Sequence, residues 1–271
     1  YENYLFINRQ DKRVLDLVKG ARAKIVSPSL PADFKKIAER NLGTHYLSAV
    51  TLAFGVAKTL GVEEEAIKKE LLQFKGLEGR QEELMEIKGI HFINDTTSTM
   101  PEAALAALER FKNLAQGSRL ILIAGGQDKD LDYKKLATEI SRKTDVLVLL
   151  PGTTTEKIGV ELRRQKKELR IIKVESMKGA VKEVWKIAEK GDWVVLSPGA
   201  ASFGLFQNEF DRGGQFVKEV NKLRKRAEFK LASMFRRQNL RQVLGTTRRS
   251  CQSAPRRGVT KKLAKFCVPF G

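Results

Sequence analysis

Short apolar segments alternate with amphipathic segments of helical period from Ile90 onward, and this alternation constrains the fold more than any other feature. Such alternation is typical of a doubly wound, mostly parallel sheet, because each crossover helix packs back onto the sheet. The expected strands are Ile90–Asn94, Leu120–Ala124, Val146–Leu150, Arg170–Val174 and Trp193–Leu196. The expected helices are Pro101–Phe111, Tyr133–Ser141, Thr155–Gln165, Lys178–Glu189 and about Glu209–Arg224. The fold class predicted for this region is therefore α/β.

The preceding residues predict the end of another α/β unit. A strand, a helix and a strand are expected at Tyr4–Ile7, Asp11–Val18 and Ala23–Val26, followed by helices at Tyr46–Leu60 and Glu63–Phe74. Gly76–Gly79 is interpreted as a linker. Beyond it, Glu83–Ile87 and Ile90–Asn94 flank Lys88-Gly89, which is the pattern of a two-residue hairpin turn. The predicted domains are residues 1–77, 78–228 and 229–271.

The positive charge is concentrated at the C-terminal end. Residues 229–271 contain seven Arg, four Lys and no acid, so they carry +11 of the formal net charge of +19. With little periodicity, this segment is predicted to be a disordered basic tail. It could bind phosphate backbones without sequence specificity, or it could be a solvated extension with no role.

Composition excludes several classes of protein. No apolar run approaches the roughly 18–20 residues of a membrane-spanning helix, so no membrane association is expected. The two cysteines, Cys251 and Cys267, cannot supply a disulfide framework for the body, and a cytoplasmic location is expected. The two histidines, His45 and His91, form no local metal motif, so no metal site is predicted in this chain.

Four polar or glycine-rich segments follow the expected strands. Open parallel sheets bind ligands beyond the carboxyl ends of their strands, so these segments are candidates for a binding site. They are residues 94–99 (NDTTST), 125–129 (GGQDK), 151–153 (PGT) and 197–204 (SPGAASFG). The alternative is that such loops are polar and glycine-rich merely because they connect strands to helices.

Individual residues in these loops have the same two interpretations. Thr99 could offer a hydroxyl to a ligand or could cap the next helix. Asp95 could hold a ribose hydroxyl or a water molecule. Lys129 suits a carboxylate or phosphate, or it could pair with Asp128 or Asp130. The small residues of 197–204 could admit a ligand or could serve tight packing.

Several common motifs are missing. The sequence has no Gly-x-x-x-x-Gly-Lys-Ser/Thr phosphate loop, no Gly-x-Gly-x-x-Gly after a strand and no Gly-x-Ser-x-Gly elbow. These absences argue against a dinucleotide site or a serine hydrolase in this chain.

Taken together, the loops resemble a known family. Residues 93–103 (INDTTSTMPEA), 123–129 (IAGGQDK), 196–203 (LSPGAASF) and 208–213 (NEFDRG) are similar to the carboxy-terminal domain of the Mur ligases, and most similar to those that add D-glutamate. The resemblance covers about Arg80–Arg226, and residues 1–77 resemble the end of the family's central, ATP-binding domain. It implies a Rossmann-like domain preceded by part of an α/β ATP-binding domain.

The resemblance also implies an activity. Mur ligases of this branch join D-glutamate to UDP-N-acetylmuramoyl-L-alanine in peptidoglycan precursor synthesis, with ATP and Mg²⁺, through an acyl phosphate. The family's phosphate loop, magnesium ligands and modified lysine would all precede Tyr1. No catalytic residue is therefore assigned in this chain, and it is expected to be inactive by itself.

Site residues follow from the resemblance position by position. Thr99, Lys129, Ser202 and Phe203 match residues that hold D-glutamate, and the list of substrate-binding candidates is completed by the aromatic Phe210. The expected position of that aromatic, counted back from Arg212-Gly213, is occupied by Glu209. Arg80 and Asp95 match positions that face the ATP.

The sequence departs from the family pattern elsewhere. Thr97 stands where the family often has lysine, and the central-domain signature His-Asn-x-x-Asn becomes residues 45–49 (HYLSA), with Tyr46 and Ala49 replacing amides. Two alternative functions stay open. One is another Mur-like ligase such as a folylpolyglutamate synthase, and the other is a nucleic-acid-binding module that uses the basic tail.

Overall fold

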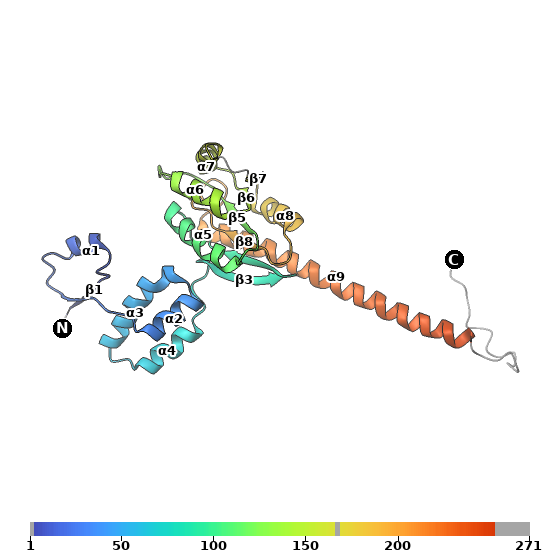
Figure 1. Cartoon of the computed structure of the whole chain (residues 1–271), viewed down its shortest axis with the longest axis horizontal. Helices are drawn as coiled ribbons and strands as arrows, with labels where there is room; N and C mark the ends of the chain where they lie inside the picture. The colour runs from blue at the N-terminus through green and yellow to red at the C-terminus, as the bar shows by residue number, and fades with distance from the viewer. Residues whose placement is uncertain (1–2, 166–168, 253–271) are drawn as a thin grey trace. The chain divides into compact units, whose positions relative to one another are not determined.

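The computed structural model describes residues 3–165 and 169–252. Its centre is a six-stranded sheet in the order β3-β4-β8-β5-β6-β7 (Figure 1). The strands are β3 (Glu82–Ile87), β4 (Ile90–Asn94), β5 (Leu120–Ala124), β6 (Val146–Leu149), β7 (Arg170–Lys173) and β8 (Trp193–Leu196). Only β3 pairs antiparallel, with β4, and the other pairs in this sheet are parallel. The predicted mostly parallel α/β sheet is confirmed.

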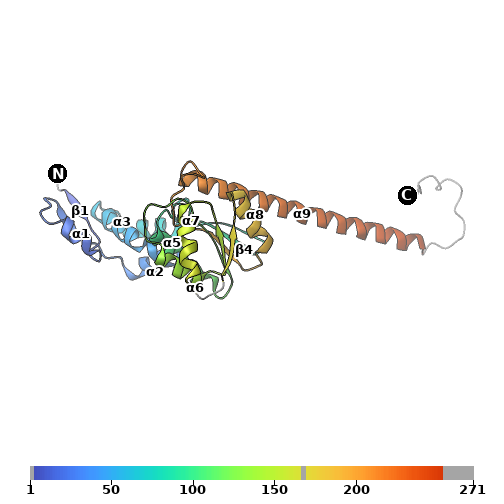
Figure 2. The same cartoon turned by 90° about the horizontal axis from the view of Figure 1, so that it is seen from above.

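Helices cover the sheet on both faces. They are α5 (Pro101–Ala115), α6 (Lys134–Lys143), α7 (Thr153–Arg163), α8 (Met177–Ile187) and the beginning of α9 (Glu209–Gln252). One buried cluster joins α5, α6 and α7 to inward residues of β4, β5, β6 and β8, and Figure 2 shows these three helices together. The strands β5 and β6 are buried along their whole length, as expected for parallel strands covered on both sides.

The β3–β4 hairpin turns at Lys88-Gly89, as predicted. Both residues have positive φ, 56° for Lys88 and 79° for Gly89, which is the requirement of a type I′ turn. Glycine adopts this conformation without steric cost, whereas the lysine must accept some strain.

Residues 3–77 contain the predicted N-terminal elements and two additional helical segments. The strands β1 (Tyr4–Phe6) and β2 (Lys24–Val26) pair in parallel, with α1 (Lys12–Leu17) between them. The helices α3 (Leu47–Thr59) and α4 (Glu64–Gln73) correspond to the predicted pair. Not predicted were α2 (Ala32–Asn41) and the short 3-10 helix η1 (Thr44–Tyr46). The helix α2 contributes Phe34 and Ala38 to a core shared with Phe54 and Leu71.

The helix α9 corrects the prediction for the C-terminal segment. A helix ending near Arg224 and a disordered tail from residue 229 were predicted, but α9 continues to Gln252. Residues 229–252 contain five Arg, three Leu and three Gln and no proline, so local helix propensity favours the helix. The rest of the predicted tail, residues 253–271, lies outside the described residues.

By compactness the chain divides into residues 1–221 and 222–271. Across residues 3–165 and 169–252, every helix is too short or too polar to cross a lipid bilayer.

Candidate functional site

Three of the loops selected from the sequence meet at the carboxyl edge of the sheet. The strand order places β8 between β4 and β5, so the loops that follow these strands are neighbours. The backbone of Gly199 donates to the carbonyl of Ser98 at 2.9 Å, which joins the loops after β8 and β4. Gln127 and Ala201 exchange two backbone hydrogen bonds of 3.0 Å, which join the loops after β5 and β8.

Glycine is necessary where these loops approach each other. Gly126 has a φ of 140°, and a Cβ atom built on it would lie 2.3 Å from the carbonyl oxygen of Ala201. Any larger residue would push the two loops apart. Gly126 is therefore required by the packing of the two loops against each other, which is a structural role.

Thr99, Lys129 and Ser202 lie on these adjoining loops. Lys129 is exposed and follows the Gln127–Ala201 bridge on one loop, while Ser202 directly follows it on the other. Thr99 is half-buried and precedes Met100, the N-cap residue of α5. The sequence prediction that a single edge of the sheet carries all three residues agrees with the structure.

The three residues differ in exposure: Lys129 is exposed, Thr99 is half-buried, and Ser202 is buried with an exposed fraction of 3%. Within residues 3–165 and 169–252, the Thr99 and Ser202 hydroxyls and the Lys129 ammonium have no hydrogen-bonded or ion-paired partner. Thr99 does not cap α5, whose N-cap residue makes no side-chain cap bond. Among the described residues Lys129 pairs with neither Asp128 nor Asp130, and Asp128 forms an ion pair with Lys157.

Phe203 and Phe210 are both exposed, Phe203 in the turn after β8 and Phe210 in the first turn of α9. Their exposed fractions are 62% for Phe203 and 65% for Phe210. Glu209, at the position where an aromatic was expected, uses its carbonyl oxygen to accept the Thr96 hydroxyl at 2.6 Å. An exposed phenylalanine next to polar ligand groups could cover the apolar part of a ligand.

Asp95 is buried, with an exposed fraction of 5%. One carboxylate oxygen accepts the backbone N–H of Gln81 at 3.1 Å, and the other accepts the Ser197 hydroxyl at 2.6 Å. Burial raises the pKa of Asp95 to about 7, although these two hydrogen bonds and the charges of Arg80 and Arg110 act in the opposite direction. Both oxygens are thus already engaged inside the protein.

Arg80 is exposed and lines a cavity of about 700 Å³ together with Tyr46 and Arg110. The hydroxyl of Tyr46, one of the departures from the family signature, donates to the Arg80 carbonyl at 3.4 Å. The neighbouring His45 has its pKa lowered to about 4 by burial and by the charge of Arg110, so its imidazole is neutral at pH 7. The cationic residues that line this cavity are Lys75, Arg80 and Arg110.

Sequence reasoning missed Arg110, Gln81 and Arg212. Arg110 donates to the carbonyl and to the side-chain oxygen of Gln81, at 3.4 and 3.3 Å, and Gln81 in turn donates to Asp95. Arg212 is completely buried. The only signal in the sequence was the Arg212-Gly213 pair itself, which was used for the resemblance but was given no structural role.

Thr97, which replaces a lysine common in the family, is engaged in the fold. Its hydroxyl donates to the carbonyl of Gly79 at 2.9 Å, and its backbone N–H donates to the same oxygen at 3.0 Å. The residue therefore ties the loop after β4 to the segment that precedes β3.

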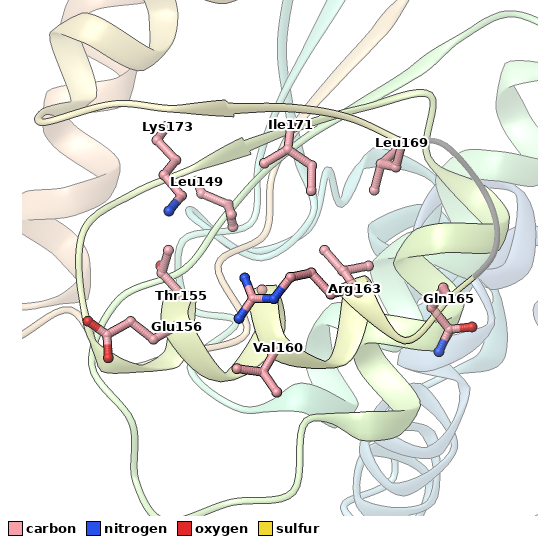
Figure 3. A pocket seen from close by; sticks show the side chains of 11 residues that line it. Leu149, Thr155, Glu156, Val160, Arg163, Gln165, Leu169, Ile171 and Lys173 are labelled. Carbon is pink, nitrogen blue, oxygen red and sulfur yellow. The ribbon is translucent and has the colours of Figure 1, made fainter.

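A separate cavity of about 690 Å³ lies between α7 and β7 (Figure 3). Its lining includes Arg163, Lys173 and Glu156 with apolar side chains such as Ile171 and Leu169. None of the residues predicted for substrate or ATP binding contributes to this lining. Within the described part of the chain, no group of three or more His, Cys, Asp or Glu side chains could hold a metal ion.

Comparison with known families gives one match. Residues 79–199 match the family described as Mur ligase, glutamate ligase domain. This range begins at the predicted linker and ends at Gly199, so it includes the loops after β4 and β5 and only the first part of the loop after β8. Ser202, Phe203 and Phe210 lie beyond it.

Curated relatives carry the same indication. The chain is 40% identical over 179 residues to the UDP-N-acetylmuramoylalanine--D-glutamate ligase of Roseiflexus sp. (strain RS-1). The aligned region covers 66% of this chain and 37% of that protein. It is 33% identical over 248 residues to the ligase of the same name from Caldanaerobacter subterraneus, which covers 83% of this chain and 53% of that protein. The chain thus spans about a third to a half of the length of these relatives.

Solved structures support the fold. A murein peptide ligase from Psychrobacter arcticus superposes with a TM-score of 0.56 at 16% identity, covering 81% of this chain and 51% of the other. The UDP-N-acetylmuramoylalanyl-D-glutamyl-2,6-diaminopimelate--D-alanyl-D-alanyl ligase from Acinetobacter baumannii gives a TM-score of 0.56 at 14% identity, covering 82% and 52%. The family match and the curated relatives confirm the resemblance inferred from the loops, whereas the solved structures support the fold alone.

Proposed function

Residues 79–199 belong to the Mur ligase, glutamate ligase domain family, and from this premise we propose that the chain is part of an ATP-dependent ligase that adds D-glutamate to UDP-N-acetylmuramoyl-L-alanine. The reaction belongs to peptidoglycan precursor synthesis and takes place in the cytoplasm. The relatives at 33–40% identity bear the name of this ligase, which favours D-glutamate over the amino acids of other Mur-like ligases.

The observation that carries the proposal is the group of unengaged polar side chains at one edge of the sheet. D-glutamate presents two carboxylates and an amine. The ammonium of Lys129 would pair with one carboxylate, and the hydroxyl of Ser202 with nearby backbone donors would hold the other. Thr99 would add a hydroxyl, and Phe203 and Phe210 would border the methylene part of the ligand.

The chemistry requires an activated acyl group. In the proposed reaction, ATP phosphorylates the alanyl carboxylate and releases ADP. The free amine of D-glutamate then attacks the acyl carbonyl, and phosphate leaves as the amide bond forms. Phosphate is a far better leaving group than the carboxylate oxygen it replaces, so the positioned amine can react. The role of this domain is to hold that amine in place.

Arg80 and Asp95 are proposed to serve the nucleotide side of the reaction. Arg80 and Arg110 supply cations that suit the phosphates of ATP at their cavity. Asp95 is assigned a supporting role, because its carboxylate already accepts hydrogen bonds from Gln81 and Ser197. Mg²⁺ would shield the phosphate charge in the complete enzyme. We assign no magnesium ligand and no catalytic residue to the described residues.

The domain organisation is part of the same proposal. Residues 1–77 would be the end of the ATP-binding domain, and residues 78–228 the domain that binds the amino acid. The basic segment 229–271 is assigned no role in the reaction, and nucleic acid is expected to bind it only without specificity.

Calorimetric titration of the whole chain with amino acids tests the proposal. D-glutamate is expected to bind more tightly than L-glutamate, D-alanine or meso-diaminopimelate. Lys129→Ala should weaken D-glutamate binding about tenfold or more, since it removes a charge-assisted hydrogen bond. Lys182→Ala, at an exposed lysine on α8, is the matched control and should leave binding unchanged. Tightest binding of L-glutamate would instead favour the folylpolyglutamate alternative, and equal losses in both variants would remove Lys129 from the site.

A further inference from the structure

Arg212 lies in the first turn of α9 and has no exposed surface, although it is charged. Arginine is seldom fully buried, because the guanidinium loses its hydration. Burial lowers the pKa of Arg212 to about 10, while the charges of Glu209 and Asp95 act to raise it. The side chain therefore remains protonated at pH 7 inside the protein.

The guanidinium of Arg212 joins two of the loops that form the candidate site. Its Nη2 donates to the carbonyl of Thr96 at 2.6 Å, and its Nε donates to the Thr96 hydroxyl at 3.2 Å. Its Nη1 donates to the carbonyl of Ala200 at 3.0 Å. Thr96 lies on the loop that carries Thr99, and Ala200 lies on the turn that carries Ser202.

These three acceptors are uncharged oxygen atoms, so the positive charge of Arg212 is not neutralised by direct contact with a carboxylate. A planar fork with several N–H donors is needed to reach both loops at once, and lysine lacks that geometry. Arg212 thus hydrogen-bonds to both loops and also places a positive charge beside them. A neutral or a shorter side chain could not do both.

Gly213 allows α9 to come close enough for these contacts. A Cβ atom at Gly213 would lie 2.6 Å from the Cγ2 atom of Thr96, which is too close. At the next glycine, Gly214, nothing lies within 4 Å of such an atom. The arginine and the glycine of this pair therefore have connected roles, one to bind the loops and the other to permit the approach.

Resting on the proposed function, we propose that Arg212 is a positioning residue for the amino-acid site. Its guanidinium holds the loop that bears Thr99 and the turn that bears Ser202 in one arrangement, and its buried charge favours a ligand with two carboxylates. Arg212 does not touch the ligand. It acts through the loops that it joins and through its electrostatic field.

The charge effect can be estimated. Two opposite unit charges about 10 Å apart, in an effective dielectric constant of about 20, attract each other enough to raise an affinity roughly tenfold. This is the size of effect expected between the Arg212 charge and a ligand carboxylate at such a distance. D-glutamine, which lacks the second carboxylate, should lose much less when the charge is removed. The comparison of the two ligands separates the charge effect from a general loss of structure.

The experiment uses the whole chain with Arg212→Gln, Arg212→Lys and the control Lys218→Gln, which changes an exposed residue of α9. Amide hydrogen exchange without ligand is measured first. In both Arg212 variants we expect at least about tenfold faster exchange at Gln127 and Ala201, with no change at Leu122 inside β5. Titrations should then show that Arg212→Gln weakens D-glutamate about tenfold and D-glutamine far less, whereas Arg212→Lys retains the ratio of the two affinities.

Unchanged exchange at Gln127 and Ala201 in the Arg212 variants would overturn the positioning role. Equal losses of D-glutamate and D-glutamine in Arg212→Gln would overturn the charge effect. If Arg212→Gln does not fold, Arg212→Lys decides the positioning role through the same amides. A wild-type chain that binds no D-glutamate contradicts the proposed function and the charge effect, and the exchange measurement still decides the positioning role.

Discussion

The buried carboxylate of Asp95 makes a specific prediction about stability. Its pKa is raised from an ordinary value of 3.8 to about 7, because burial disfavours the charged form. The folded state therefore binds this proton more tightly than the unfolded state does. Stability from the protonated carboxyl is fully present below pH 3.8 and is lost as the pH rises through about 7.

The magnitude follows from the size of the shift. Each pKa unit corresponds to about 1.4 kcal/mol, so a shift of about three units amounts to roughly 4 kcal/mol. In Asp95→Asn the side chain has a similar shape and cannot ionise. Its oxygen can still accept from Gln81, and its amide can donate to the Ser197 hydroxyl. The free energy of unfolding of Asp95→Asn, minus that of the wild type, should rise by about 1.4 kcal/mol per pH unit up to about pH 7 and then level off.

Urea unfolding at pH 5, 6, 7 and 8 measures this difference. Fluorescence is a suitable signal because both tryptophans, Trp185 and Trp193, lie within the α/β domain. Glu175→Gln, at an exposed carboxylate on the loop before α8, is the control and should give a difference that is independent of pH. An equally flat difference for Asp95→Asn would refute the reasoning, since it would mean that the burial of Asp95 does not raise its pKa.

Further predictions concern the same edge of the sheet. Gly213→Ala should destabilise the protein by about 1–3 kcal/mol, because its new methyl would overlap a threonine methyl. Gly214→Ala should be neutral or stabilising by up to about 1 kcal/mol. The melting temperatures of the two variants compare these effects directly. Ser98 has a buried hydroxyl with no partner among the described residues, so Ser98→Ala should not lower the urea midpoint, while Ser197→Ala should cost about 1–3 kcal/mol. Deletion of residues 229–271 should leave the affinity for D-glutamate unchanged in a calorimetric titration. A loss of affinity would show that the basic segment contributes to binding.

Much of the fold could be predicted from periodicity. Leu120–Ala124 and Trp193–Leu196 are strands with the predicted bounds, because a short continuous apolar run between turn residues is typical of a buried strand. The order of the strands was not predictable in the same way, since the position of β8 between β4 and β5 depends on contacts between residues that are far apart in sequence. The helix α2 was missed although Phe34, Ile37 and Ala38 stand at the spacing of one helix face, so the periodic signal was present in the sequence.

The candidate site likewise contains residues that the sequence indicated and residues whose role it did not indicate. Its proposed ligand-facing residues, Lys129 and Ser202, lie on loops that the sequence already placed at the carboxyl ends of strands. Their individual roles were inferred from the family resemblance. Its supporting residues, Asp95 and Arg212, were not recognised as supports, because charged residues are mostly exposed and their burial depends on partners elsewhere in the chain. For Asp95 the sequence indicated a ligand contact, while in the structure its carboxylate binds Gln81 and Ser197.

The central claim is that D-glutamate binds between the Lys129 ammonium and the turn that carries Ser202. A crystal structure of the chain with D-glutamate measures this directly. We predict one ligand carboxylate about 2.7–2.9 Å from the Lys129 Nζ atom and the other within hydrogen-bond distance of the Ser202 hydroxyl. Ligand bound elsewhere, or a Lys129 side chain directed away from the edge shared by the three loops, would contradict the account.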